Sequence, residues 1–156
     1  MQNNDLLRRI RFIFDYSDYE MLEIFELAQM PVTRSQISDW LKREDDPEFK
    51  IITDSEMASF LNGLINKNRG KKDGEQPEPE TRLTNNIIFK KLKIALDLKS
   101  DDILEILKLA NFKLGKSELS AFFRRNSSRQ YRVCQDQVLR NFLMGLQKKY
   151  RVVGDQ

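Results

Sequence analysis

The sequence repeats itself at a constant offset of 82 residues, and this duplication limits the folds that the chain can adopt. The segment LEIFELA at residues 22–28 returns as LEILKLA at residues 104–110, and residues 3–67 match residues 85–149 without a gap. The identical pairs include Asn3/Asn85, Asp15/Asp97, Asp54/Asp136 and Gly63/Gly145. An ungapped repeat of this length indicates two copies of one structural unit joined in tandem.

Each copy carries the apolar spacing of four amphipathic helices. Leu6, Leu7, Ile10 and Phe14 recur at helical spacing, and the matching positions of the second copy are apolar too. The expected capping residues are Asn4 or Asp5 and Asn86 for the first helices, Asp18 and Ser100 for the second, Thr33 (with Gly115 in the duplicate) for the third, and Asp54 and Asp136 for the fourth. Between the third and fourth helices, EDDPEFKIIT and NSSRQYRVCQ include alternating apolar and charged residues, which predicts a short extended segment.

A glycine falls inside the fourth helix of each copy, at Gly63 and Gly145. Glycine in a helix interior costs about 1 kcal/mol relative to alanine, because it loses more backbone entropy on folding. Its presence at matching positions predicts that a neighbouring helix approaches the backbone closely there. The approaching helix can belong to the same repeat or to the other one.

The segment RGKKDGEQPEPETR at residues 69–82 differs in composition from both copies. Its two prolines, two glycines and alternating charges offer little to bury, which predicts a flexible tether. We therefore expect an all-α protein of two tandem four-helix repeats, with the first repeat at residues 1–68, a flexible linker at residues 69–84 and the second repeat at residues 85–151. Domains of this size are marginal when isolated, which favours packing between the repeats.

Helices two and three of each copy also have the apolar spacing of a helix-turn-helix motif. Val32, Ile37 and Trp40 fall where that motif fixes its recognition helix, so that the exposed face of this helix can enter a DNA groove. The glycine usual in the turn is replaced by Pro31, however, and any helical bundle needs similar apolar positions. The spacing is therefore helix-turn-helix-like, and the motif itself is one of two interpretations.

No part of the sequence marks the chain for export or for a membrane. No apolar run approaches the roughly 18 to 20 residues of a membrane span, and the first residues lack a signal peptide pattern, which favours a cytoplasmic protein. Cys134 is the single cysteine, so no intrachain disulfide can form. Because the matching residue of the first copy is Ile52, we expect an inert thiol in the core.

Two segments of the first copy resemble a known family. WLKREDDP at residues 40–47 and FLNGLI at residues 60–65, inside two tandem helical repeats, resemble the YehS-like bacterial family of unknown function over essentially the whole chain. The resemblance implies a small cytosolic bacterial protein with duplicated domains, and it implies no activity, cofactor or functional residue. The second copy reads FFRRNSSR where the first reads WLKREDDP, so no site is carried over.

The chain contains no histidine, which excludes much of enzyme chemistry. Without histidine it lacks the usual general base near neutral pH and the Ser-His and Cys-His nucleophile arrangements, and with one cysteine it lacks every standard structural zinc pattern. The sequence also has no Walker glycine loop and no GxGxxG motif. We therefore expect a protein that is not an enzyme and uses no cofactor.

Carboxylates gather at Glu44, Asp45, Asp46 and Glu48. Paired carboxylates can catalyse hydrolysis or bind a hard cation through oxygen ligands. The spacing is not that of an EF-hand, and the matching residues 126–130 contain no carboxylate. The cluster therefore favours a solvated acidic loop, or a surface for a basic partner, over a metal site.

The charge is divided unevenly between the copies. Residues 1–69 carry nine Lys and Arg against 13 Asp and Glu, whereas residues 83–156 carry 15 against seven. The basic residues expected to contact nucleic acid are Lys116, Arg124, Arg125, Arg129 and Arg132, with Tyr131 as a stacking ring. We therefore predict a non-catalytic binding module for DNA or RNA that acts through its basic second repeat.

The acidic first repeat supports an alternative. Glu44, Asp45, Asp46 and Glu48 would contact a basic protein partner, or the basic loop of a second copy in a head-to-tail assembly. Both charged segments can also be ordinary solvated surface with no binding role. The sequence leaves open the choice between DNA, RNA and protein, the identity of any partner, and the oligomeric state.

Overall fold

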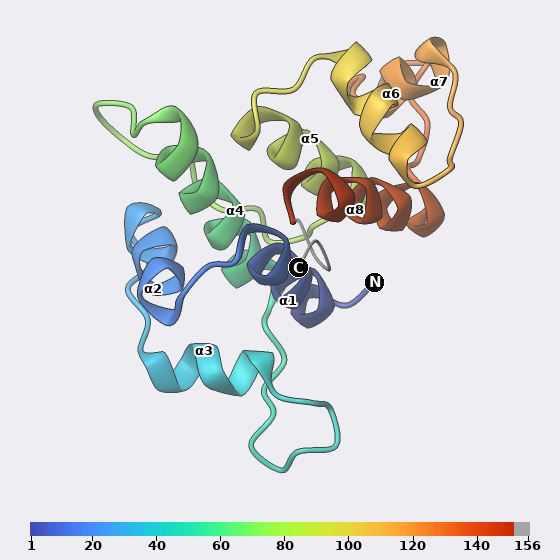
Figure 1. Cartoon of the computed structure of the whole chain (residues 1–156). Helices are drawn as coiled ribbons and strands as arrows, with labels where there is room; N and C mark the ends of the chain where they lie inside the picture. The colour runs from blue at the N-terminus through green and yellow to red at the C-terminus, as the bar shows by residue number, and fades with distance from the viewer. Residues whose placement is uncertain (152–156) are drawn as a thin grey trace. The chain divides into compact units, whose positions relative to one another are not determined.

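The computed structural model describes residues 1–151, which form eight α-helices and no strand, four helices in each repeat (Figure 1). The helices are α1 (Asn3–Phe14), α2 (Asp18–Leu27), α3 (Arg34–Leu41), α4 (Asp54–Arg69), α5 (Asn85–Ala95), α6 (Ser100–Leu109), α7 (Lys116–Phe122) and α8 (Asp136–Tyr150). The chain divides into two compact units, one at Met1–Leu83 and one that begins at Thr84. The predicted all-α fold of two tandem repeats is confirmed.

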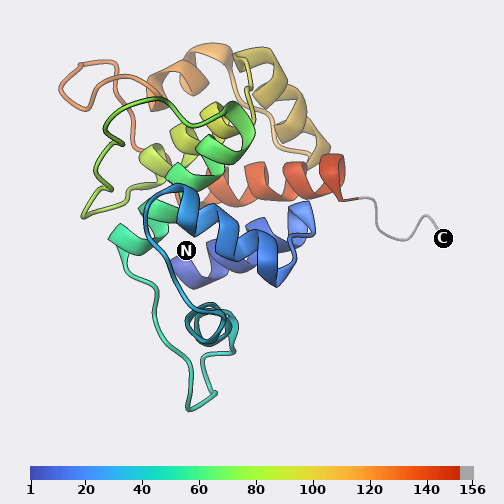
Figure 2. The ribbon, with the colours of Figure 1, turned by 90° about the vertical axis from the view of Figure 1, so that its left-hand side faces the viewer.

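Both units use the same helix packing. In the first unit α4 packs along α2, α3 packs on α2, and α1 contacts α3 and α4. In the second unit α8 packs along α6, α7 packs on α6, and α5 contacts α8. Figure 2 shows α3 end-on while α2 runs across the view, so these two helices cross rather than run side by side.

An aromatic cluster fills the core of each unit. In the first unit the ring of Phe25 lies 5.4 Å from Trp40 and 5.1 Å from Phe60. In the second unit Phe89 takes the central place, 4.6 Å from Phe142. Phe25 is matched by Leu107 and Phe89 by Leu7, and all four are fully buried. The large ring therefore lies on the second helix in one unit and on the first helix in the other, an exchange that keeps the summed volume of these two positions and that cores tolerate well.

The two helical glycines face a neighbouring helix of their own unit. A Cβ atom on Gly63 would lie 1.8 Å from the carbonyl oxygen of Ile24, and one on Gly145 would lie 2.1 Å from that of Ile106. Both distances are far below van der Waals contact, so only glycine fits. The predicted close approach is confirmed, and it occurs within each repeat, between α2 and α4 and between α6 and α8.

A buried asparagine near the start of each repeat ties three segments together. The Nδ2 of Asn4 donates to the carbonyls of Trp40 and Lys50, both at 2.8 Å, and its Oδ1 accepts from the amide of Ile52 at 3.2 Å. The equivalent bonds of Asn86 join Phe122 O at 3.0 Å, Arg132 O at 2.8 Å and Cys134 N at 2.9 Å. These bonds connect the first helix to the end of the third helix and to the segment before the fourth.

The expectation that Asn4, Asp5 or Asn86 caps the first helix is therefore wrong. Asn4 and Asn86 lie inside α1 and α5, and their side chains are occupied by long-range bonds. Thr84 caps α5 instead, because its hydroxyl accepts from the amide of Ile87 at 3.2 Å. Gln2 stands at the N-cap of α1, and its side chain makes no capping bond to the first turn of this helix.

Four other predicted caps are displaced by one residue. Ser17 caps α2 in a capping box with Glu20, and Thr53 caps α4 in a box with Glu56, so Asp18 and Asp54 are each one residue too late. In the second unit α6 follows Lys99 rather than a capping Ser100, and α8 follows Gln135 rather than a capping Asp136. Asp54 and Asp136 instead accept hydrogen bonds of 2.7 Å from Asn3 and Asn85. The amides of Ser17 and Thr53 also donate to the carboxylate of a glutamate three residues later, and this second bond explains why these two residues, and not Asp18 and Asp54, are the caps.

The third helices begin where the sequence predicts. Thr33 and Gln36 form the predicted capping box of α3, with bonds of 3.1 and 2.8 Å. Gly115 precedes α7, and its amide donates to the carboxylate of Glu118 at 3.0 Å. The segments at residues 49–53 and 131–135 join no strand in the described part of the chain. Their backbone groups bind the asparagine side chains instead.

The expected linker lies within the first unit as far as Leu83. Helix α4 continues to Arg69, one residue beyond the predicted boundary, and residues 70–84 form no helix. Asn66 donates to Gln76 at 3.1 Å, and the amide of Leu83 donates to Asp54 at 2.9 Å. These bonds attach the middle of the segment and its C-terminal end to the first unit, and its flexibility stays a prediction.

The thiol of Cys134 is buried, as predicted for a core residue. Burial raises the pKa of this thiol to about 12, and the nearby Asp136 carboxylate adds to the shift. We expect the folded protein to resist the thiol reagent DTNB at pH 8 and the unfolded protein to react fully, because only the thiolate attacks. The thiol of the unfolded chain ionises at a lower pH than the buried thiol. The contribution of Cys134 to the free energy of unfolding therefore decreases as the pH rises, up to about pH 12. Rapid full reaction of the native protein would contradict this burial.

No helix in the described part of the chain combines the length and the apolar character needed to cross a bilayer.

Candidate nucleic-acid-binding surface

Each unit has a long loop between its third and fourth helices. We call residues 42–53 the EDDPE loop and residues 123–135 the basic loop. In Figure 2 both extend away from the helices of their own unit, the first in teal and the second in orange. Their tips share one backbone turn, with the bonds Asp46 N to Arg43 O (3.0 Å) and Phe49 N to Asp46 O (3.0 Å), matched by Ser128 N to Arg125 O (2.9 Å) and Tyr131 N to Ser128 O (3.2 Å). The two loops therefore have the same backbone turn at their tips but carry different side chains there.

The basic loop exposes three guanidinium groups. Arg124, Arg125 and Arg129 are exposed, and their side chains form no hydrogen bond or ion pair with the rest of residues 1–151. Arg132 is exposed but donates from Nη1 to the carbonyls of Arg129 at 3.1 Å and Tyr131 at 2.9 Å. The four predicted arginines thus lie on one loop, and one of them helps to hold the loop.

The other two predicted contacts differ from this group. Tyr131 is partly buried, so only part of its ring can stack on a base. Lys116 lies outside the loop, as the first residue of α7, and its Nζ is 3.5 Å from the carboxylate of Asp101. Both side chains of this pair are largely exposed, and such pairs contribute little to stability. Lys116 is therefore accessible to a stronger anion.

The carboxylates of the EDDPE loop do not converge on one point. Asp46 accepts from the amide of Glu48 at 2.8 Å, and Asp45 lies 3.5 Å from the guanidinium of Arg43. Glu44 and Glu48 are exposed. Within residues 1–151 no group of three or more His, Cys, Asp or Glu side chains is placed to hold a metal ion. The alternative protein-binding set therefore offers a dispersed negative surface.

The connection between the second and third helices differs from a helix-turn-helix turn. It covers residues 28–33, and the motif usually has three to four residues there. Gln29 has a left-handed φ of 61°, and Met30 N donates to Phe25 O at 3.1 Å while Gln29 N donates to Glu26 O at 2.8 Å. This is a Schellman ending, and it lengthens the connection. The first unit therefore has two successive helices, as in a helix-turn-helix motif, but the connection between them is longer than the turn of that motif.

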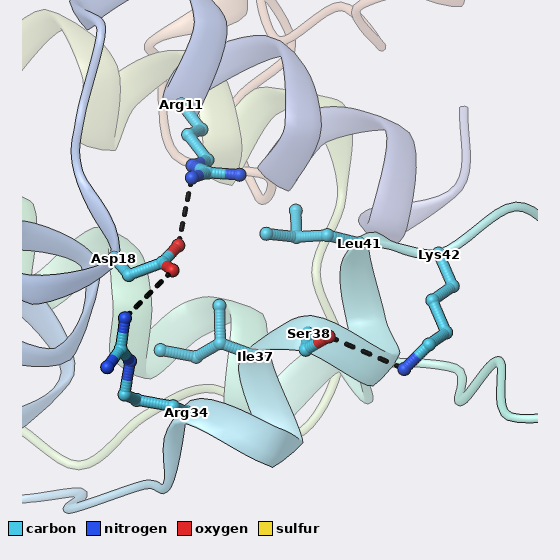
Figure 3. Close-up of a pocket in the computed structure, with 7 residues that line it drawn as sticks. All are labelled: Arg11, Asp18, Arg34, Ile37, Ser38, Leu41 and Lys42. Atoms are coloured by element: carbon cyan, nitrogen blue, oxygen red, sulfur yellow. Dashed lines mark hydrogen bonds and ion pairs between the residues drawn. The ribbon is translucent and has the colours of Figure 1, made fainter.

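A cavity of about 360 Å³ lies between α1, the start of α2 and α3 in the first unit (Figure 3). The residues that line it are Arg11, Asp18, Arg34, Ile37, Ser38, Leu41 and Lys42. The Asp18 carboxylate accepts from Arg11 at 2.9 Å and lies 3.4 Å from Arg34, so it bridges two helices through two cations. We call this group the first-repeat cation pocket.

Lys42 lies at the far side of the first-repeat cation pocket. Its ammonium group is 2.6 Å from the carboxylate of Asp39 and 3.4 Å from the hydroxyl of Ser38. The hydrogen bond to Asp39 raises the pKa of Lys42, so the lysine stays charged at neutral pH. The pocket was not predicted, because its residues are scattered over three helices. Comparison of the two copies does not single it out either, because every Lys and Arg of residues 1–69 is matched by a Lys or Arg at the offset of 82 residues.

Comparison with known proteins identifies relatives over nearly the whole chain. The family described as "Protein of unknown function (DUF1456)" matches residues 3–70 and 85–151, which are the two repeats. The chain is 41% identical over 153 residues to "Uncharacterized protein YehS" of Escherichia coli (strain K12), covering 97% of this chain and 98% of that protein. No solved structure matches the chain. The resemblance seen in the sequence is confirmed, and the chain belongs to the DUF1456 family of proteins of unknown function.

Proposed function

We propose that this protein is a non-catalytic nucleic-acid-binding module whose basic loop contacts backbone phosphates. The observation that carries the proposal is the exposure of Arg124, Arg125 and Arg129, without protein partners in residues 1–151, on one projecting loop. Guanidinium groups bind phosphate as planar forks and are weakly hydrated, so the loop is suited to a phosphate backbone. The same turn of the first repeat has Lys42 and Arg43 at the positions of Arg124 and Arg125, but four carboxylates follow them, so a net positive turn belongs to the second repeat alone.

The charge of the second repeat supports the same proposal. Residues 83–156 carry 15 Lys and Arg against seven Asp and Glu. Such an excess attracts a polyanion from a distance and raises its association rate, with a strong dependence on salt. Phosphate contacts position a nucleic acid but do not read its bases. We therefore expect binding that depends weakly on base sequence.

Fluorescence anisotropy with labelled duplex DNA and single-stranded RNA, over a salt series, tests the proposal. The variant Arg124→Gln/Arg125→Gln/Arg129→Gln removes three phosphate contacts. We expect its affinity to fall about tenfold or more, and the slope of log affinity against log salt on duplex DNA to lose roughly 0.9 for each contact removed. Circular dichroism melting of the variant shows whether the fold is retained.

A matched control removes the same charge elsewhere in the second repeat. Lys90, Lys99 and Lys113 are exposed and lie outside the basic loop, so Lys90→Gln/Lys99→Gln/Lys113→Gln changes the net charge equally. We expect this control to lose less than about threefold in affinity, because it keeps the local contacts. Equal losses in both variants would mean that net charge, not the loop, determines binding. Failure of the wild-type protein to bind either probe at low salt would overturn the proposal.

The shared turn of the two loops supports a second candidate function. Opposite charges on one frame suit a protein adaptor in which Glu44, Asp45, Asp46 and Glu48 contact a basic surface, including the basic loop of another copy. An adaptor of this kind leaves the anisotropy of both nucleic acid probes unchanged. The same titration therefore separates the two functions.

A further inference from the structure

The first-repeat cation pocket contains an anion supplied by the chain itself. The carboxylate of Asp18 lies between the guanidinium groups of Arg11 and Arg34, as Figure 3 shows. Two cations from α1 and α3 thus converge on a single pair of oxygens. A phosphate group has the same kind of acceptor oxygens and would suit the same two donors.

The second repeat keeps the cations and loses the anion. At the offset of 82 residues, the three basic positions of the pocket stay basic and its serine stays a serine. The matching pairs are Arg11/Lys93, Arg34/Lys116, Lys42/Arg124 and Ser38/Ser120. Asp18, in contrast, is replaced by Ser100. Asp18 is the acidic residue among those that line the first-repeat cation pocket, and the second repeat has no acid at the matching position.

The surroundings of these residues are equivalent in the two units. Asn86 ties α5 to the end of α7 with the same bonds that Asn4 makes in the first unit. The ammonium group of Lys93 lies 5.3 Å from the ring centre of Phe123, and Phe123 matches Leu41 of the pocket lining. Lys93 therefore points toward the region that corresponds to the first-repeat cation pocket.

Two acidic residues near the start of α6 do not replace Asp18. Asp102 accepts from the amide of Lys99 at 2.8 Å, so its carboxylate turns back to the start of the helix. Asp101 meets Lys116 at 3.5 Å, but both side chains are more than 70% exposed. An exposed pair of this kind is readily exchanged for a better ligand.

We propose that the second repeat binds a backbone phosphate of a nucleic acid at the position that the Asp18 carboxylate occupies in the first repeat. Lys93 and Lys116 contact the phosphate from α5 and α7, and Arg124 joins them from the start of the basic loop. This inference rests on the proposed function and extends it from the loop to the helices. It also predicts that only the second repeat binds phosphate at this position, because the first repeat fills its own site with Asp18.

The variant Ser100→Asp tests the site without removing any basic residue. It supplies the carboxylate that the first repeat has, and we expect it to weaken binding of duplex DNA about fivefold to tenfold and to lower the salt slope by roughly one. Ser100 is the first residue of α6, where a negative charge favours the helix, so the melting temperature should be unchanged or higher. Unchanged DNA affinity in this variant would overturn the inference.

Two further variants complete the design. Asn111→Asp adds the same charge beyond the opposite end of α6, and we expect it to change the affinity less than twofold. Asp18→Ser removes the internal anion of the first repeat, and we expect it to increase DNA affinity by opening a second phosphate site. A loss in Asn111→Asp as large as in Ser100→Asp would show a general charge effect and contradict the site.

A titration of the whole isotope-labelled protein with inorganic phosphate separates this inference from the proposed function. We expect the amide resonances of Ser100 and Lys116 to shift with saturation in the wild-type protein and not in Ser100→Asp. Shifts of this kind support the phosphate site even if the protein binds no DNA or RNA, a result that overturns the proposed function alone. If neither phosphate nor nucleic acid shifts these resonances, the site is wrong.

Discussion

Replacing Gly145 with alanine should destabilise the second repeat by about 3 kcal/mol or more. A Cβ atom would lie 2.1 Å from the carbonyl oxygen of Ile106, so α8 must move away from α6. Overpacking commonly costs about 1 to 3 kcal/mol, and the contact here is with backbone rather than with a flexible side chain, which places the effect at the upper end. The gain of about 1 kcal/mol from helix propensity is too small to compensate. Urea denaturation followed by circular dichroism measures the change.

Gly115→Ala is the matched control in the same repeat. Its Cβ would lie 2.9 Å from the end of the Glu118 side chain, which can rotate away, and φ at Gly115 is −74°. We expect a loss of about 1 kcal/mol or less, from the N-cap position alone. Gly63→Ala should act on the first repeat as Gly145→Ala acts on the second, because its Cβ would lie 1.8 Å from Ile24. A variant Gly145→Ala as stable as the wild type would show that α6 and α8 do not pack as described.

The sequence predicts most of the fold because two copies report on each helix. The eight helices, the buried aromatic rings and the close approach at Gly63 and Gly145 are all visible in the alignment of the copies. It does not show which helix approaches the glycines, because a glycine indicates a short distance and not a partner. Only the packing of Ile24 against Gly63 places that contact within one repeat.

Cap positions are harder to predict because adjacent residues compete for the same backbone amides. Ser17 and Asp18 can each cap a helix, and the choice depends on Glu20, which completes a box with Ser17 only. The same competition separates Thr53 from Asp54. The roles of Asn4 and Asn86 could not be predicted locally, because their partners lie 36 to 48 residues away in sequence.

In the candidate site, too, the sequence predicts one part and only the folded structure shows the other. The charge of the basic loop is a property of composition, and the sequence alone identifies its arginines. The folded loop adds that Arg132 holds the backbone whereas Arg124 faces solvent. The bridge from Arg11 through Asp18 to Arg34 is a property of three-dimensional packing, because it joins three helices. Charge can therefore be predicted from sequence, but the convergence of charges cannot.

Replacing Asn86 with alanine should also destabilise the second repeat by about 3 kcal/mol or more. The change removes the partners of the Phe122 carbonyl, the Arg132 carbonyl and the Cys134 amide. Each buried group left without a partner costs about 1 to 3 kcal/mol, and water that enters the space left by the side chain recovers part of the sum. Asn141→Ala is the control, because Asn141 is partly exposed and its side chain bonds, among residues 1–151, only the Gln137 carbonyl of its own helix. We expect that control to change stability by less than about 0.5 kcal/mol.

Asn86→Asp separates the donor role of this side chain from its acceptor role. The aspartate keeps an oxygen for the Cys134 amide but turns a second oxygen toward the carbonyls of Phe122 and Arg132, which repel a negative charge. The pKa of the new carboxyl should therefore be raised in the folded state above its ordinary value of about 3.9, with burial adding to the effect. A group whose pKa is raised in the folded state stabilises the fold at a pH below its unfolded pKa and loses that contribution as the pH rises. We therefore expect Asn86→Asp to be more stable near pH 4 than near pH 7, when each value is compared with that of Asn86→Ala. If the two variants differ in unfolding free energy by the same amount at pH 4 and pH 7, the Asn86 amide does not face the two carbonyls. That result would also contradict the hydrogen bond from Asn86 to the Arg132 carbonyl, which holds the basic loop against α5.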